Sequence, residues 1–166
     1  MPFHPMLGFA GTDYEKVRED FRKVTDPYTG KEIFVVPPIR PDWAVIHAIR
    51  ADGNGNVVCS ALESDRLAVL AAKRAVVTVE EVVPAESLVA RPGEIYLSAL
   101  HIDTVVVAPR GAHPAACVHT YEIDRDHVQQ YLAAAKTEEG FREYLARFVL
   151  GKTEEEYLEL ACGKAA

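Results

Sequence analysis

The chain has 166 residues, of which 49% are hydrophobic and 26% charged, and its formal net charge is −7 at pH 7. This length and composition are typical of one globular domain with a buried core, and the acidic balance argues against a nucleic-acid-binding surface, which needs a basic patch. The sequence has no apolar run of membrane-spanning length, no signal-peptide pattern and only three cysteines, so we expect a cytoplasmic protein without a membrane partner.

The N-terminal part is predicted to contain a helix, a turn and a short strand. Thr12 and Glu15 have the spacing of a capping box, which predicts a helix over 11–24. A turn is expected at 25–30, and the EIFVV segment at 32–36 is typical of a strand that ends at a pair of prolines. Four apolar residues fall on one face of the predicted helix: Tyr14, Val17, Phe21 and Val24.

The central part predicts strands that alternate with a helix. The apolar run at 43–49 is typical of a strand buried on both faces, and the DGNGN turn at 52–56 indicates a hairpin with the strand that follows. Ser64 is expected to cap a helix whose apolar face contains Leu67, Leu70 and Ala71. Three further strands are expected at 74–83, 94–100 and 103–109.

The C-terminal third is predicted to be helical. Apolar residues recur at helical spacing over 128–135 and again over 141–148, and Gly151 is expected to end the second of these helices. Thr153 and Glu156 form a second capping box that opens a last short helix. The pattern as a whole predicts one α/β domain over 1–166, with a mostly parallel sheet flanked by helices and a helical C-terminal segment.

The PRGAHPAACVHTY segment at 109–121 follows a predicted strand directly, where α/β proteins place ligand-binding loops. It contains His113, Cys117 and His119, which leaves three functional interpretations open. Zinc usually needs four ligands and this segment offers at most three, while a Cys–His nucleophile lacks a visible orienting group. A ligand-binding loop needs only Gly111 and a nearby proline, with His113 as a titratable hydrogen-bonding group.

Other candidate residues have ordinary structural alternatives. His47 lies within an apolar strand, where most histidines are hydrogen-bonded core residues. Glu80 is a candidate acid or base if burial raises its pKa, but a carboxylate near a strand end is more often solvated or hydrogen-bonded. The RADGNGN turn also fits a simple hairpin connection.

Three segments in the expected order resemble family I coenzyme A transferases. RPDWAVIHAIRADGNGNVV resembles the family's segment N-P-D-hydrophobic-I-H-x-x-R-A-D-x-x-G-N, and AAKRAVVTVEEVV resembles the helix and strand that follow it. VVVAPRGAHPAACVHTYEIDRDHVQQY resembles the family's V-P-x-G-A-H-P segment. The likeness is greatest to α subunits of the glutaconate CoA-transferase group, which also includes hydrolases of a ring carbon–carbon bond and a decarboxylase, all acting on CoA thioesters.

This resemblance implies a CoA-transferase-like fold and transfer of CoA between an acyl-CoA and a carboxylic acid. It implies a nucleophilic glutamate on a β-type partner subunit, no metal, and no permanently bound cofactor beyond the CoA thioester substrate. It also implies that the N-terminal half of such a subunit is absent here, with two alternatives: a separate chain supplies that half, or this sequence is a fragment of a longer subunit. Hydrolysis, decarboxylation or a non-catalytic structural role are the alternatives to CoA transfer. The implied substrate-binding residues are Gly111, Ala112, His113 and Pro114, with a turn near the site at Arg50, Asp52, Gly55 and Asn56.

Overall fold

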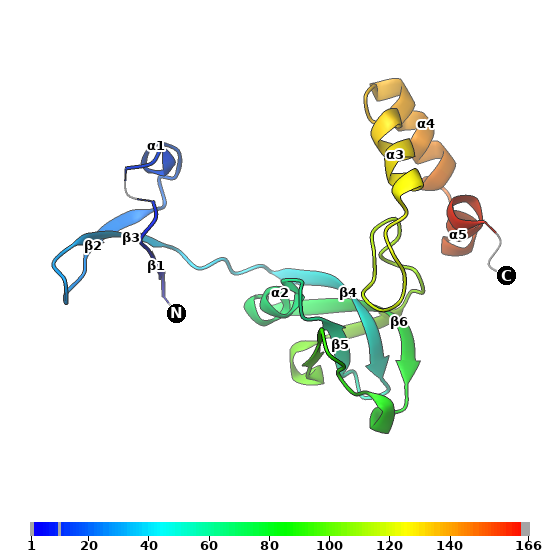
Figure 1. The fold of residues 1–166 in the computed structure, drawn as a ribbon, viewed down its shortest axis with the longest axis horizontal. Coiled ribbons are helices and arrows are strands. Elements are labelled where there is room, and N and C mark those ends of the chain that lie inside the picture. The colour runs from blue at the N-terminus through cyan, green and yellow to red at the C-terminus, as the bar shows by residue number, and fades with distance from the viewer. Residues whose placement is uncertain (1, 10, 164–166) are drawn as a thin grey trace.

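The computed structural model describes residues 2–9 and 11–163. They form a small N-terminal sheet, a five-stranded sheet and a C-terminal group of helices. Figure 1 shows that the small sheet stands apart from the larger one, at the end of an extended segment over residues 37–42. Two adjacent prolines, Pro37 and Pro38, begin this segment, and Pro41 lies near its end.

The N-terminal unit is built on short strands, and the helix predicted over 11–24 is wrong beyond its first turn. The helix α1 covers only Tyr14–Val17, after which the chain turns into β2 (Arg22–Thr25). β2 and β1 (His4–Met6) both pair antiparallel with β3 (Glu32–Val36). Of these three strands, β3 was predicted.

An aromatic stack explains why the helical pattern of this segment does not produce a long helix. The ring of Phe9 lies 4.4 Å from that of Tyr14 and 5.6 Å from that of Phe21, so these apolar residues pack on one another. The glutamate of the predicted capping box, Glu15, instead accepts a hydrogen bond from the amide of Gly11.

The larger sheet is mixed and has the order β7-β5-β4-β6-β8. Its strands β4, β6 and β8 are parallel, whereas β5 and β7 are antiparallel to their neighbours. The predicted α/β fold with a sheet flanked by helices is confirmed, as is the β4–β5 hairpin. The five strands are β4 (Trp43–Asp52), β5 (Val57–Ser60), β6 (Arg74–Val83), β7 (Glu94–Leu97) and β8 (Thr104–Val107).

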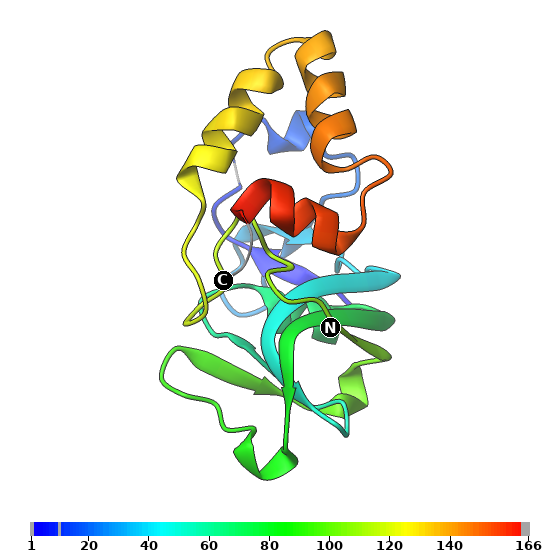
Figure 2. The same ribbon diagram turned by 90° about the vertical axis from the view of Figure 1, so that its right-hand side faces the viewer.

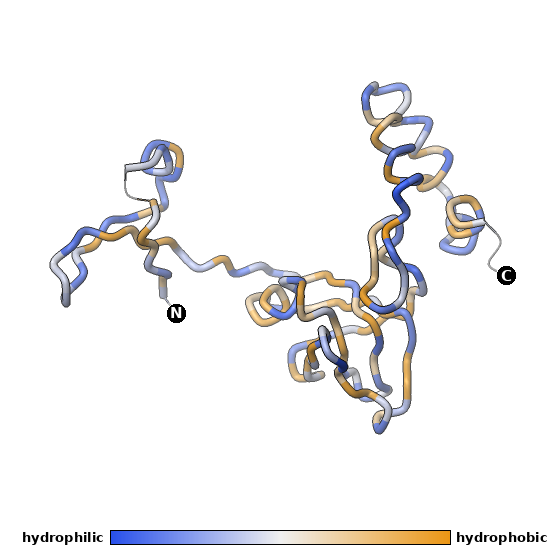
Figure 3. The backbone as a smooth tube through the Cα atoms, in the orientation of Figure 1, coloured by the Kyte–Doolittle hydropathy of each residue, from blue (hydrophilic) through white to orange (hydrophobic). Residues whose placement is uncertain are grey.

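One face of this sheet is covered by the helix α2 (Asp65–Ala71), and the core lies between them. The residue that α2 buries is Val69, whereas Leu67 and Leu70 of the predicted apolar face are exposed. Figure 3 shows that hydrophobic residues are gathered along the central strands. The core includes Ala44, Ile46, Ala48, Ala75, Val77 and Val79 of the central strands.

The first half of β4 is not buried on both faces, contrary to the sequence-based expectation. Val45 is 72% exposed and Trp43 is 48% exposed, because no helix of the described residues covers that side. The antiparallel partner β5 pairs only with Arg50 and Ala51 near the end of β4. Residues 43–48 therefore have a strand partner on the β6 side alone, within the part of the chain that the structure describes.

Three helices follow β8, as predicted: α3 (Arg125–Ala134), α4 (Glu138–Phe148) and α5 (Glu154–Cys162). Figure 2 shows α3 and α4 as a hairpin, with α5 crossing below them toward the sheet. The predicted capping box of Thr153 and Glu156 is present. Two 3₁₀ helices, Ala85–Ser87 and Ala99–His101, lie in the connections before and after β7. Among the described residues, no helix is long and apolar enough to cross a membrane.

Candidate functional site

The carboxylate of Glu80, on β6, joins the sheet to the loop that follows β8. Its Oε1 lies 2.6 Å from Nε2 of His47 on β4 and accepts a hydrogen bond from the hydroxyl of Tyr121 at 2.9 Å. Its Oε2 accepts a hydrogen bond from the amide of Arg110 at 2.7 Å. The other ring nitrogen of His47 lies 2.8 Å from Oγ1 of Thr78. Glu80 is therefore a hydrogen-bonded, mostly buried carboxylate.

The loop lies directly against the face of the sheet that α2 leaves uncovered. A Cβ atom on Gly111 would come within 2.9 Å of Cε1 of His47 and 2.8 Å of the Ala108 carbonyl oxygen. The amide of Ala112 donates to the hydroxyl of Tyr121 at 3.0 Å. The glycine predicted to matter in this loop is thus required by the close approach of the loop backbone to β4.

Arg110 has an unusual conformation for a residue with a side chain. Its φ is +60°, in the left-handed region that costs an L-residue about 1–2 kcal/mol. Its side chain is exposed, and its guanidinium carbon lies 5.1 Å from the centre of the Tyr121 ring. Within residues 2–9 and 11–163, Arg110 forms no ion pair with a carboxylate.

The ring of His113 points into the protein rather than into an open pocket. Its side chain is 1% exposed, with Nδ1 2.7 Å from the hydroxyl of Tyr157 on α5 and Nε2 3.2 Å from Oδ2 of Asp124. The ring of His127 packs edge-on at 5.2 Å. Burial raises the pKa of Tyr157 to about 12, so its hydroxyl remains protonated. His113 thereby fixes the loop to the C-terminal helices, and Pro114 lies half-buried beside it.

The histidines and cysteine that suggested a metal site or a nucleophile do not come together. His119 places Nδ1 3.1 Å from Oε1 of Glu94, whereas His113 faces the helices. Cys117 is buried, which raises the pKa of its thiol, and its Sγ lies near His47 and Glu80.

His47, Glu80 and Cys117 offer three potential ligand atoms within 4.8 Å of one another. In a tetrahedral zinc site, nitrogen and oxygen ligands lie about 3.3 Å apart because each is about 2.0–2.1 Å from the metal. The 2.6 Å between Nε2 of His47 and Oε1 of Glu80 is instead a hydrogen-bond distance. This group is thus described best as a hydrogen-bonded pair next to a thiol.

Of the predicted turn residues, Arg50 belongs to a second network, which meets the loop at His119. Arg50 donates to both carboxylate oxygens of Glu94, at 3.1 and 2.6 Å, and to the carbonyl oxygen of Val89. Burial alone would raise the pKa of Glu94, but hydrogen bonds from Arg50, the Arg91 amide and His119 outweigh it and hold the pKa at about 2.

The hairpin turn itself is closed by Asp52. Oδ1 of Asp52 accepts hydrogen bonds from the amides of Asn54 and Asn56, both at 2.9 Å. Gly55 has φ of +86°, which favours glycine. The turn and the edge of β8 line a pocket of about 430 Å³, and residues 111–114 are not part of its wall.

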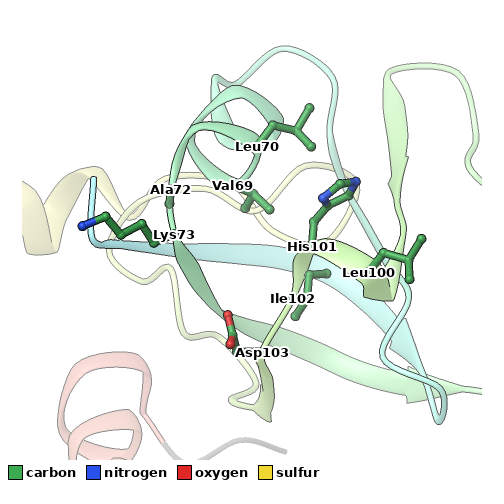
Figure 4. A pocket seen from close by; sticks show the side chains of 8 residues that line it. All are labelled: Val69, Leu70, Ala72, Lys73, Leu100, His101, Ile102 and Asp103. Atoms are coloured by element: carbon green, nitrogen blue, oxygen red, sulfur yellow. The ribbon is translucent and has the colours of Figure 1, made fainter. Parts of the chain in front are cut away.

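A second pocket, of about 230 Å³, lies between the end of α2 and the 3₁₀ helix before β8. Figure 4 shows Leu70 and His101 on one side of it and Asp103 on another. None of the predicted site residues lines it.

The structure thus brings Glu80 and the loop together, and Arg50 meets the same loop through Glu94 and His119, whereas the hairpin turn at 52–56 lies apart. Tyr121 and Tyr157 complete the loop's contacts, although no sequence pattern singled them out. Tyr121 is 41 positions from Glu80 and Tyr157 is 44 positions from His113, so neither contact leaves a local periodicity.

Comparisons with known proteins agree with this fold. The Coenzyme A transferase family model matches residues 2–108. A 3-oxoadipate CoA-transferase subunit of Pseudomonas knackmussii is 35% identical over 91% of this chain and 53% of the relative. The cholesterol ring-cleaving hydrolase IpdA subunit of Rhodococcus jostii is 30% identical over 95% of this chain and 56% of the relative. The chain therefore spans about half the length of these relatives.

Two solved structures share the backbone arrangement. Glutaconate coenzyme A-transferase of Acidaminococcus fermentans matches with a TM-score of 0.84 and 28% identity, covering 96% of this chain and 56% of that one. A variant of the decarboxylase AibA/AibB matches with a TM-score of 0.71 and 31% identity, covering 89% of this chain and 55% of that one. From the family match and the shared backbone together, the chain belongs to the coenzyme A transferase family.

Proposed function

We propose that this chain is part of a cytoplasmic enzyme that moves CoA between an acyl-CoA and a carboxylic acid. The observation that carries the proposal is the backbone match to glutaconate coenzyme A-transferase over 96% of the chain, at a TM-score of 0.84. In this proposal the CoA thioester is a substrate, and the enzyme needs neither a metal nor a permanently bound cofactor.

The proposed chemistry is covalent and uses a glutamate of a β-type partner subunit. That carboxylate attacks the acyl-CoA thioester, which gives an acyl-glutamyl anhydride and CoA thiolate. The thiolate then attacks the anhydride at the glutamyl carbonyl, which releases the donor acid and leaves a glutamyl-CoA thioester. The acceptor acid reverses both steps, and a carboxylate suits this work because both of its adducts are activated acyl groups.

The part of the present chain is to position substrate rather than to react. Residues 111–114 form a wall of the acyl pocket through their backbone, since the ring of His113 is turned inward. Glu80 is assigned a positioning role because its two oxygens are already bonded to His47, Tyr121 and the Arg110 amide.

The strand β4, which is paired on one side only over its first half, is an argument for a partner. Residues 43–48 leave one strand edge and an exposed apolar side chain, Val45, available for pairing. A strand from polypeptide outside residues 1–166, either a separate chain or a further segment, would extend the sheet there.

Two other functions have specific support. The similarity to the IpdA subunit favours hydrolysis of a carbon–carbon bond in a CoA thioester, and the similarity to AibA/AibB favours decarboxylation. A non-catalytic structural role in the same assembly is the remaining alternative, because a shared fold does not determine the reaction.

The test is to purify the chain with its co-purifying partner and incubate the complex with an acyl-CoA and a labelled carboxylic acid. We expect label in the CoA thioester, and a CoA adduct on a glutamate of the partner that peptide mass spectrometry locates. Loss of carbon dioxide or a ring-opened acid without transfer would instead establish an alternative reaction. No turnover of any CoA thioester by the intact complex would refute the enzymatic proposal.

A further inference from the structure

We propose that Arg110 binds an anionic group of the substrate, a carboxylate or a phosphate, and sets which acid the enzyme accepts. This inference rests on the proposed function. It assigns a binding role to a residue whose backbone is held in place by Glu80 and whose side chain is held by Tyr121.

The backbone of Arg110 is held in a conformation that side chains rarely adopt. Its φ is +60°, and the hydrogen bond from its amide to Oε2 of Glu80 stabilises it. His119 has a similar φ of +62°, but its ring bonds to Glu94 within the chain. The guanidinium of Arg110 has no carboxylate partner among the described residues. Strained backbone of this kind is concentrated at functional sites, which makes the unpaired guanidinium a binding candidate.

The Tyr121 ring gives the guanidinium a fixed support. The tyrosine hydroxyl donates to Glu80 at 2.9 Å and accepts from the Ala112 amide at 3.0 Å. These two hydrogen bonds fix the position of the ring. The guanidinium carbon of Arg110 lies 5.1 Å from the ring centre, within the range of a cation–π contact. The guanidinium N–H groups, five donors in all, form no hydrogen bond within residues 2–9 and 11–163, so they are free to donate to a ligand.

The free donors define the class of ligand. A guanidinium donates two parallel hydrogen bonds to a carboxylate or a phosphate, and does so with more directional preference than an ammonium group. CoA transfer involves both groups, since the acid substrate has a carboxylate and CoA has phosphates.

The experiment compares wild type, Arg110→Gln and Arg110→Lys in the purified complex. Calorimetry measures binding of glutarate, with two carboxylates, against pentanoate, with one on a chain of equal length. Transfer kinetics compare CoA thioesters with their 3′-dephospho forms. The matched control is Arg66→Gln, an exposed arginine on α2 over the opposite face of the sheet.

We expect Arg110→Gln to weaken glutarate binding at least tenfold and to change pentanoate binding less than twofold. Arg110→Lys should keep part of the affinity for glutarate, because lysine retains the positive charge. If glutarate binding is unchanged but the preference for the 3′-phosphate is lost, Arg110 binds the CoA phosphate, and its role in selecting the acid is refuted. Unchanged binding and kinetics in both comparisons, at unchanged thermal stability, overturn the inference. If the wild-type complex transfers no CoA, the proposed function fails, while the glutarate titration still tests Arg110 directly.

Discussion

Gly111 lies against the ring of His47 so closely that a Cβ atom would come within 2.9 Å of the ring carbon Cε1. The same atom would come within 2.8 Å of the Ala108 carbonyl oxygen, which is backbone and cannot move aside alone. The loop after β8 therefore depends on glycine here for lack of space.

Gly111→Ala is expected to destabilise the protein by about 1–3 kcal/mol, the usual cost of overpacking. His47→Ala in the same chain should recover only part of this loss, because the clash with the Ala108 carbonyl remains. Gly53→Ala is the matched control, since nothing lies within 4 Å of its Cβ position. Equal unfolding free energies for both alanine variants in denaturant titrations would contradict the observed packing.

His113→Ala is expected to act mainly on thermal stability, because the ring is buried between Tyr157 and Asp124. Loss of this buried hydrogen-bonding group should cost about 1–3 kcal/mol. Tyr157→Phe should share part of that cost, so the double variant should lose less than the sum of the two. His101→Ala, at an exposed histidine, is the control. A variant of normal stability with a large loss in kcat/KM would instead place the ring in contact with substrate.

Glu94→Gln is expected to destabilise the protein in a pH-dependent way. The folded-state pKa of Glu94 is about 2, below its ordinary value of 4.5, because Arg50, the Arg91 amide and His119 outweigh the effect of burial. A lowered carboxylate pKa contributes stability that is full above about pH 4.5 and is lost as the pH falls toward 2.

Near neutral pH, the variant should lose about 3 kcal/mol or more, since it leaves the buried Arg50 guanidinium without a counter-charge. Unfolding free energies at several pH values between 3 and 7 check this, and the gap to wild type should narrow at the acid end. Glu86→Gln, at an exposed glutamate, should show no such gap. A gap that stays constant with pH would exclude the proposed linkage.

The three cysteines are expected to differ in their reactivity toward iodoacetamide. Burial raises the pKa of Cys59 from 9.0 to about 11, which lowers its thiolate fraction about a hundredfold near neutral pH. Cys117 is buried as well, whereas Cys162 is exposed. Intact-mass analysis of the native chain should therefore show one rapid modification, at Cys162, and three in urea. Rapid labelling of Cys59 in the native chain would contradict its burial.

Val45→Glu is expected to change how the chain associates. An unpaired apolar strand edge promotes association, so the wild-type chain purified alone should self-associate and transfer no CoA. A charge at position 45 should reduce that self-association and also weaken assembly with the partner. Leu67→Glu is the control, because Leu67 is 69% exposed on the opposite face of the sheet. A wild-type chain that is monomeric by light scattering and that transfers CoA without a partner would refute this prediction.

Elements with local signals were predictable from the sequence, and elements determined by distant contacts were not. The DGNGN hairpin and the capping box of Thr153 and Glu156 depend on residues within five positions of each other, and both are present. The helix predicted over 11–24 failed because Phe9, Tyr14 and Phe21 stack together while β2 pairs with β3. The same limit applies to the site, where Glu80 and the loop could be selected but Tyr121 could not.

The segment over residues 37–42 has a mechanical consequence for any complex that the chain enters. Pro37, Pro38 and Pro41 restrict its backbone, and a proline-rich extended segment spans about 3.1 Å per residue. Such a segment confines the small sheet to a smaller volume around the five-stranded sheet than a flexible linker of equal length would. It therefore raises the effective concentration of β1–β3 at a surface within reach, once the five-stranded sheet is bound. A glycine and serine linker of equal length would lower that concentration and weaken binding without removing a single contact.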